Sequence, residues 1–209
     1  MQQQITTNAL LNKRQKLLVF KYFLYKTLEW WHKESGQSIQ QNDFGVVKTM
    51  KLLFFTSSIE NDDNYYLLDN VFNKFYALPR GHVESDVYSE LNNNRASLSP
   101  YDINIWNTSI NATNNTDDIR TSIIEEMRTE DIADHDIICN KIDSALFSLK
   151  EKNNTFILYN DDDLVRISHD WVSWRKNMKE AIKNGKRAKS ITIEEIKQDF
   201  KTYSFDPMF

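Results

Sequence analysis

The sequence is short of the residues that build cofactor loops and disulfide frameworks. Its 209 residues include only four glycines, three prolines and one cysteine. It contains no Gly-x-Gly-x-x-Gly, Gly-Lys-Ser/Thr or Gly-x-Ser-x-Gly motif, so a phosphate-cradling loop or a serine nucleophile elbow is not indicated and we expect no cofactor. The lone Cys139 can form neither an internal disulfide nor a cysteine-based zinc cluster. Its place in the apolar run Ile137–Cys139 predicts a buried structural thiol.

Long uninterrupted apolar runs are also missing. The most apolar stretch, Leu17–Trp31, is broken by Lys21, Lys26 and Glu29, whereas a membrane span needs about 20 mostly apolar residues. The first ten residues lack the basic region and cleavage site of a secretory signal. We therefore expect a cytoplasmic protein with no membrane partner. The net charge of -4 predicts no general attraction to nucleic acid, so such contact would need a local basic patch.

What is present is globular in composition, with 40% hydrophobic and 27% charged residues. The pattern predicts a mainly α fold, a compact helical domain over residues 1–209 with a small β-hairpin and a long polar insertion. The longest helix is predicted over residues 9–33, with Thr7 or Asn8 as its cap and Ser35-Gly36 at its end. Apolar residues on most of its sides favour a central core position over an oligomer contact, and Trp30-Trp31 are either both buried or divided between core and surface.

Residues 43–91 form the most distinctive block. A helix over 44–58 is expected to start at Asp43, with Lys48 and Lys51 in solvent. A hairpin is expected from Tyr65–Leu68 and Val71–Ala77, which flank Asp69-Asn70. Pro79 and Gly81 stand together in a chain that has few of either, which indicates a required backbone shape. A short helix follows, marked by apolar residues at Val83, Val87, Tyr88 and Leu91.

The second half predicts an insertion and then further helices. Residues 95–129 are read as the insertion, with an ordered piece around Trp106 and a helix over 117–129. C-terminal helices are expected within 132–203, over 132–151, after Asp161–Asp163, over 173–183, and from the Thr192–Glu195 capping box to Tyr203. The acidic run 160–163 fits a helix N-terminus; its rival reading is a metal loop, although the spacing lacks the interleaved ligands of a calcium site.

Catalytic patterns are weak. Ser168-His169-Asp170 are sequence neighbours, whereas a triad joins separated segments, so His169 is expected to be a structural histidine beside Trp174. We expect no enzyme. The alternative that stays open is a small hydrolase or nuclease using His169 with Asp170 or Asp163. The basic turn Lys183–Lys189 is read as a solvated loop, with contact to nucleic acid or protein as its alternative.

Three segments, taken in order, resemble the Panacea-domain family, the SocA-like antitoxins often described as phage-associated proteins. The first, 48–55 (KTMKLLFF), includes Lys51 and Leu52 and is similar to the family's K-L-x-K-L-L-Y-F/Y-A helix. The second runs from Phe75 to Leu91 and resembles F-x-A-x-x-x-G-P-V-x-x-x-V-Y-x-x-L. The third, 164–174 (LVRISHDWVSW), resembles L-x-x-L-T-H followed by P-W. The match covers about residues 43–203, with Gly81, Val83, His169 and Trp174 as its structural positions.

The resemblance implies a mostly helical protein that binds and neutralises a cognate toxin, encoded by an adjacent gene, and in one branch of the family also serves as a proteolytic adaptor. It brings no catalytic residues and no metal. On this basis a partner-binding surface is expected at the aromatic and turn residues Phe75, Tyr76, Arg80, His82 and Tyr88, because interface cores favour Tyr, Phe and Arg. Three positions depart from the family pattern, where His82 and Ser173 replace prolines and Ser168 replaces threonine.

Overall fold

The computed structural model describes residues 10–59, 65–93, 101–104, 109–112 and 116–199. It is mainly helical with a small antiparallel sheet, which confirms the predicted fold class. The helices are α1 (Lys13–Ser35), α2 (Val46–Ser58), α3 (Tyr66–Asn70), α4 (Ser85–Asn93), α5 (Thr116–Thr129), α6 (His135–Lys152), α7 (Asp161–His169), α8 (Val172–Lys183) and α9 (Ile193–Lys197), with 3-10 turns at Ile39–Gln41 and Phe156–Leu158. The strands are β1 (Phe75–Leu78), β2 (Gly81–Glu84), β3 (Tyr101–Asn104), β4 (Ser109–Ala112) and β5 (Lys189–Ser190).

Helix α1 is buried on most of its sides, so the prediction of a central helix is confirmed. Trp30 is 1% and Trp31 is 4% exposed, which places both rings in the core. The helix starts at a capping box in which Asn12 and Gln15 satisfy each other's backbone N–H groups, not at Thr7 or Asn8, which lie outside the described residues. It ends, as predicted, at Gly36 in the left-handed conformation.

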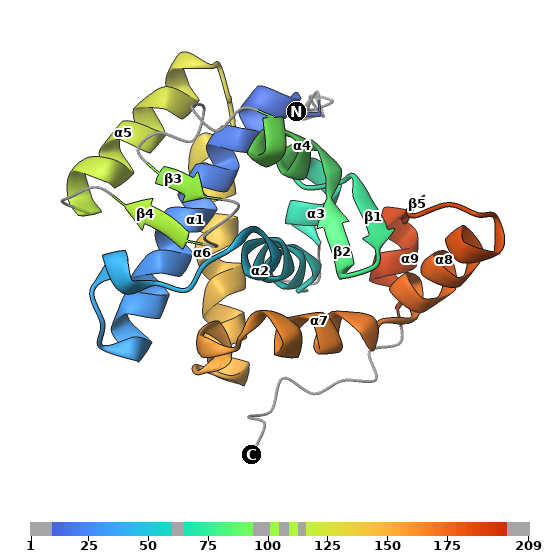
Figure 1. Ribbon diagram of the computed structural model, residues 1–209. Coiled ribbons are helices and arrows are strands. Elements are labelled where there is room, and N and C mark those ends of the chain that lie inside the picture. The colour runs from blue at the N-terminus through green and yellow to red at the C-terminus, as the bar shows by residue number, and fades with distance from the viewer. Residues whose placement is uncertain (1–9, 60–64, 94–100, 105–108, 113–115, 200–209) are drawn as a thin grey trace.

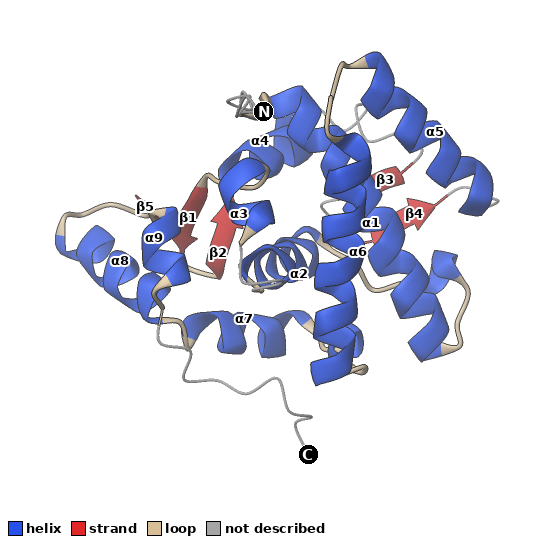
Figure 2. Cartoon of the chain, turned by 180° about the vertical axis from the view of Figure 1, so that it is seen from behind, coloured by secondary structure: helices blue, strands red, loops and turns tan. Residues whose placement is uncertain are grey.

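Helix α2 occupies the middle of the molecule in both ribbon views (Figures 1 and 2). Helices α1 and α6 lie on one side of it, the β1–β2 hairpin lies on the other, and α7 packs along it. Helices α8 and α9 lie beyond the sheet, at the end of the molecule opposite α5. This arrangement puts the hairpin between α2 and the C-terminal helices.

The sheet has the order β2-β1-β5 and is antiparallel throughout. Leu78 pairs with Gly81 across a two-residue turn, Pro79-Arg80, and Tyr76 pairs with Ser190 of β5. Proline suits the first position of such a turn because its φ is already fixed near −65°. The unusual Pro79–Gly81 spacing is therefore the hairpin turn itself.

The predicted hairpin around Asp69-Asn70 was wrong. Residues 66–70 form the short helix α3, and the hairpin lies further along, at Phe75–Leu78 and Gly81–Glu84. Local aromatic content suggested a strand, but α3 packs on α2 and α6, and this packing decides the conformation. Val83 lies on β2 and not on the helix that follows, which begins at Ser85.

Two expectations about α2 also failed. Asp43 does not cap the helix, because the N-cap is Gly45, which has no capping side chain; Asp43 instead forms an ion pair of 2.7 Å with Lys48. Lys48 and Lys51 are not solvated, since they are 0% and 1% exposed. Helix α2 is thus surrounded by protein along both its apolar and its basic sides.

The later part of the chain follows the predictions more closely. Helices α5, α6 and α8 begin and end within three residues of the expected bounds, and α7 begins at the acidic run as predicted. Helix α5, placed in the insertion, packs on α1. Strands β3 and β4 pair with each other, while Trp106 lies outside the described residues. The Thr192–Glu195 capping box is present, but α9 ends at Lys197; Phe200 and Tyr203 also lie outside the described part. Within that part, none of the helices is long and apolar enough to cross a membrane.

Candidate functional site

The three segments that carry the family resemblance meet at the β1–β2 turn. Lys51 comes from α2, Gly81 and His82 come from the start of β2, and Ser168 comes from the end of α7. Gly81 has a φ of 97°, and a Cβ built on it would overlap the Oγ of Ser168 and lie 2.8 Å from the Cε of Lys51. Only glycine fits this contact, because its backbone conformation and its lack of a side chain are both required.

His82 is a core residue. It is 0% exposed, and its ring stacks on Phe54 at a centroid distance of 3.7 Å. Its Nδ1 lies 3.0 Å from the Oγ of Ser168 and its Nε2 lies 3.1 Å from the Oγ of Ser173. A neutral ring satisfies both contacts, since it donates at one nitrogen and accepts at the other. Burial, and then the charge of Lys51, hold the pKa of His82 well below its usual value.

His82, at the position where the resembling motif has proline, thus takes part in a network that proline could not make. The backbone N–H of His82 donates to the Oγ of Ser168 at 3.2 Å, and proline lacks this N–H. Ser168 and Ser173 stand at the two other positions where the sequence differs from the pattern it resembles, and both bond to His82. The three departures are therefore physically coupled.

Lys51 is a buried amine without a carboxylate in hydrogen-bonding contact in the described part of the chain. Its Nζ donates to the backbone carbonyl of His82 at 2.5 Å. Burial, and then the positive charge of Arg80, lower the pKa of Lys51 to about 7. Near neutral pH this side chain is consequently divided between its charged and neutral forms.

His169 and Trp174 close the site from the C-terminal side. The indole Nε1 of Trp174 donates to the backbone carbonyl of Leu78 at 2.8 Å, and the ring of His169 stacks on Trp174 at 3.6 Å. Burial and then Lys51 lower the pKa of His169, while a backbone hydrogen bond with Pro79 raises it. These contacts hold the β1–β2 turn in place, as expected for a structural histidine.

Ser168 and Asp163, two polar residues near His169 in the sequence, have the following contacts. The Oγ of Ser168 bonds to His82, and the backbone N–H of Asp163 is capped by Asn160 at the start of α7. The charge of Asp170, the other candidate acid, acts to raise the pKa of His169. Among the described residues no group of three or more His, Cys, Asp and Glu side chains could hold a metal ion.

A groove lies on the outer side of this junction. It has a volume of about 250 Å³, and its walls come from the start of α2, the hairpin and α4. Its lining is mainly apolar and comprises Val46, Val47, Met50, Lys51, Leu78, Pro79, Arg80, Val83 and Tyr88. Arg80 is exposed at the rim, where its guanidinium lies 3.3 Å from the carboxylate of Asp162. The arrangement can accept an apolar side chain next to a charged group.

The predicted partner-binding residues divide between the protein surface and the core, and of the accessible ones Arg80 and Tyr88 line the groove. Tyr76 is 37% exposed and Arg80 and Tyr88 are at least partly accessible. The expectation of exposure was wrong for Phe75, at 1%, and for His82, at 0%. Phe75 points inward because side chains alternate along β1, and its ring packs against Phe54 at 5.5 Å. Leu52, from the first motif, is also a core residue, at 1%.

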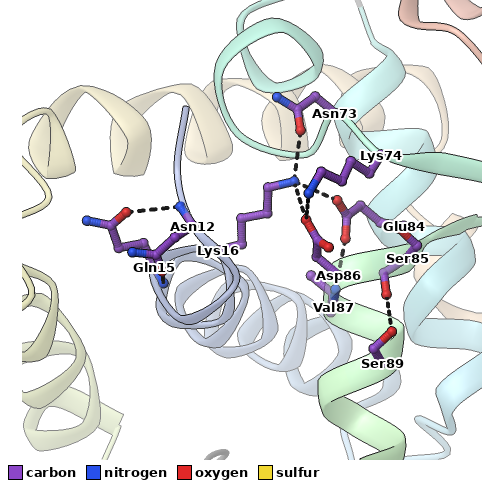
Figure 3. A network of polar contacts seen from close by, with 10 residues as sticks. All are labelled: Asn12, Gln15, Lys16, Asn73, Lys74, Glu84, Ser85, Asp86, Val87 and Ser89. Atoms are coloured by element: carbon purple, nitrogen blue, oxygen red, sulfur yellow. Dashed lines mark hydrogen bonds and ion pairs between the residues drawn. The ribbon is translucent and has the colours of Figure 1, made fainter. Parts of the chain in front are cut away.

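A buried ion cluster that no local sequence pattern indicates lies where β2 ends and α4 begins (Figure 3). Lys16, 1% exposed, reaches from α1 to carboxylate oxygens of Glu84 and Asp86, each at 3.0 Å, and to Asn73 at 2.8 Å. Burial raises the pKa of Glu84. Burial also acts to raise the pKa of Asp86, but hydrogen bonds from Lys16 and Lys74 outweigh it and lower that pKa. The cluster ties α1 to the end of β2, so it positions the hairpin and α4.

Cys139 is buried on α6, and burial followed by the negative charge of Asp143 raises the pKa of its thiol to about 12. A thiol that remains protonated is a poor nucleophile, which agrees with a structural role.

No family model, curated protein or solved structure matches this chain.

Proposed function

We propose that this protein is a protein-binding module of the antitoxin type, which neutralises a partner toxin by docking it over the groove between α2, the hairpin turn and α4. The observation that carries the proposal is the meeting of the three resembling segments at one junction, with an apolar groove on its outer side. The family resemblance supplies the expectation that the partner is a toxin encoded by an adjacent gene.

The chemistry of the groove supports a protein partner of a definite kind. Its lining is apolar except for Lys51 and Arg80, and both of these are basic. A partner that inserts an aliphatic or aromatic side chain flanked by a carboxylate would complement it, because buried apolar anchors beside desolvated charge pairs form the energetic centre of many interfaces. Tyr88 and Arg80 are of the residue types that most often act as such anchors.

The junction behind the groove supports a rigid docking surface. The turn is held from behind by Ser168, His169 and Trp174, so it would bring little conformational disorder to a complex. A preorganised surface loses less entropy on binding than a mobile loop does. His82, Ser168 and Ser173 add hydrogen bonds to this support.

The experiment is coexpression with the product of the adjacent gene. We expect that product to arrest growth on its own, and that coexpression of this protein relieves the arrest and yields a copurifying complex. Val47→Glu and Tyr88→Ala should each abolish relief, since both side chains line the groove. Phe147→Ala is the matched control, because Phe147 is apolar, 61% exposed and on α6. Circular dichroism verifies that all variants fold. The proposal would be overturned if the products of the adjacent genes neither copurify with this protein nor are neutralised by it.

A further inference from the structure

Positive charge is concentrated in one part of this acidic protein. Residues 172–189, which cover α8 and the turn after it, contain seven basic residues and one acidic residue, although the whole chain has a net charge of -4. Helix α8 lies at one end of the molecule, on the far side of the sheet from α2 (Figures 1 and 2). The charge is therefore gathered on a protruding edge.

Two of the seven basic residues are neutralised within the fold. Lys176 pairs with Glu195 at 2.9 Å and Lys189 pairs with Glu180 at 2.6 Å. The other five are exposed, and none of them has an ion pair with any residue that the structure describes. We call these five the α8 basic row: Arg175, Lys179, Lys183, Lys186 and Arg187.

The first three members of the row lie on one face of α8. Arg175, Lys179 and Lys183 follow one another at intervals of four residues, which aligns them over about 12 Å. Like charges at this spacing destabilise a helix by a few tenths of a kcal/mol per pair. The helix dipole favours a cation at Lys183, near the C-terminus, but not at Arg175, in the first half of the helix. The stability of the helix thus does not explain why three cations are aligned on one face of α8. Binding of an external anion would explain their alignment.

The turn that carries Lys186 and Arg187 has a fixed geometry. Gly185 is left-handed, with a φ of 64°. The N–H of Lys186 donates to the carbonyl of Ala181 at 2.8 Å, and that of Gly185 donates to Ile182 at 3.0 Å. These two bonds make a Schellman motif. Pairing of β5 with β1 fixes the other end of the turn. The turn therefore holds Lys186 and Arg187 between two fixed ends.

We propose that the α8 basic row binds the phosphate backbone of duplex nucleic acid without reading its sequence. Phosphates supply regularly spaced anions on a convex surface, and cations held on a protruding helix and turn can contact several of them together. The only aromatic residue in 172–189 is Trp174, whose ring stacks on His169 and whose N–H bonds to Leu78. The row therefore offers no free stacking platform for single-stranded bases. This inference is independent of the groove.

The exposed side chain of Ile182 distinguishes a nucleic-acid partner from an acidic protein partner. Ile182 is 66% exposed and lies within the row. A protein partner would bury it, so Ile182→Ala would weaken that complex, whereas a phosphate backbone depends on the cations alone.

The test measures binding of a fluorescently labelled duplex oligonucleotide to the full chain by anisotropy, over a series of salt concentrations. We expect binding at low salt that is similar for unrelated sequences, with a slope of log K against log salt of about −4.5 for five phosphate contacts. The triple variant Arg175→Gln, Lys179→Gln, Lys183→Gln should bind at least about tenfold more weakly, with a slope of about −2. Ile182→Ala should leave the affinity unchanged.

The matched control removes the same charge elsewhere. Lys13, Lys33 and Lys152 are exposed, and their triple change to Gln should leave both affinity and slope close to those of the unchanged chain. No binding at low salt would overturn the proposal. Equal weakening by the two triple variants would overturn it as well, since only net charge would then matter. Loss of duplex affinity in Ile182→Ala would also contradict it, because contacts of the cations alone would then not account for the binding.

Discussion

Gly81 and Ser168 approach so closely that Gly81 has no room for a side chain, although 87 positions separate them in the sequence. The contact joins the hairpin turn to the end of α7. It is bridged by the Oγ of Ser168, which accepts the backbone N–H of His82 at 3.2 Å. The position of the hairpin, and with it one wall of the groove, thus depends on a glycine.

Gly81→Ala should destabilise the protein by about 2–4 kcal/mol, because it adds a strained backbone conformation to a steric overlap. Urea denaturation measures the change. Gly185→Ala is the control, since Gly185 has a φ of 64° and open space around its Cα; it should cost only about 1 kcal/mol. Equal costs at the two positions would show that the contact with Ser168 is unimportant.

A second prediction concerns pH. The pKa of Lys51 is lowered by burial to about 7 in the folded state, from 10.5. Between these values the unfolded chain binds more protons, so stability should rise with pH from about 7 to 10, by roughly 1 kcal/mol per pH unit, and level off outside that window. Lys51→Met should flatten this rise. Denaturant midpoints across the range measure it, and an unchanged slope in the variant would contradict the assignment.

A third prediction concerns the buried ion cluster. Lys16→Met leaves Glu84 and Asp86 buried without their principal cation and should destabilise the protein by about 3–5 kcal/mol. Lys16→Met combined with Glu84→Gln should recover part of the loss, since it removes one stranded charge and keeps an oxygen to accept the N–H of Val87. Lys13→Met, at an exposed position on the same helix, should change stability little. Purely additive costs in the double variant would argue against the cluster.

Local pattern was sufficient for the helices whose apolar faces and caps lie within their own sequence. Helix α7 shows this: Asn160 accepts the N–H of Asp163, and acids fill the first turn. Local pattern failed where distant contacts decide. Lys48 and Lys51 read as solvated because lysine is rarely buried, but they fold against Asp43 and the carbonyl of His82.

The candidate site, too, was predictable from local pattern only where distant contacts do not decide the structure. The segments could be picked out from the sequence, since Pro79 and Gly81 mark the turn and Trp174 marks the start of α8. The sequence could not show which side chains of these segments face outward. Phe75 and Tyr76 are adjacent aromatics, and only the strand register, set by pairing with β2 and β5, assigns one to the core and the other to the surface. The hydrogen bonds of His82 join residues 86 and 91 positions apart, beyond any local pattern.

The central claim is that a toxin docks over the groove, and hydrogen exchange of the complex tests it most directly. Backbone amides of the free protein and of its copurified complex with the adjacent gene product are compared by mass spectrometry. Added protection should concentrate in residues 46–51 and 78–88, with little change in α6 around Phe147. Protection confined to other surfaces, with 46–51 and 78–88 unchanged, would contradict the account.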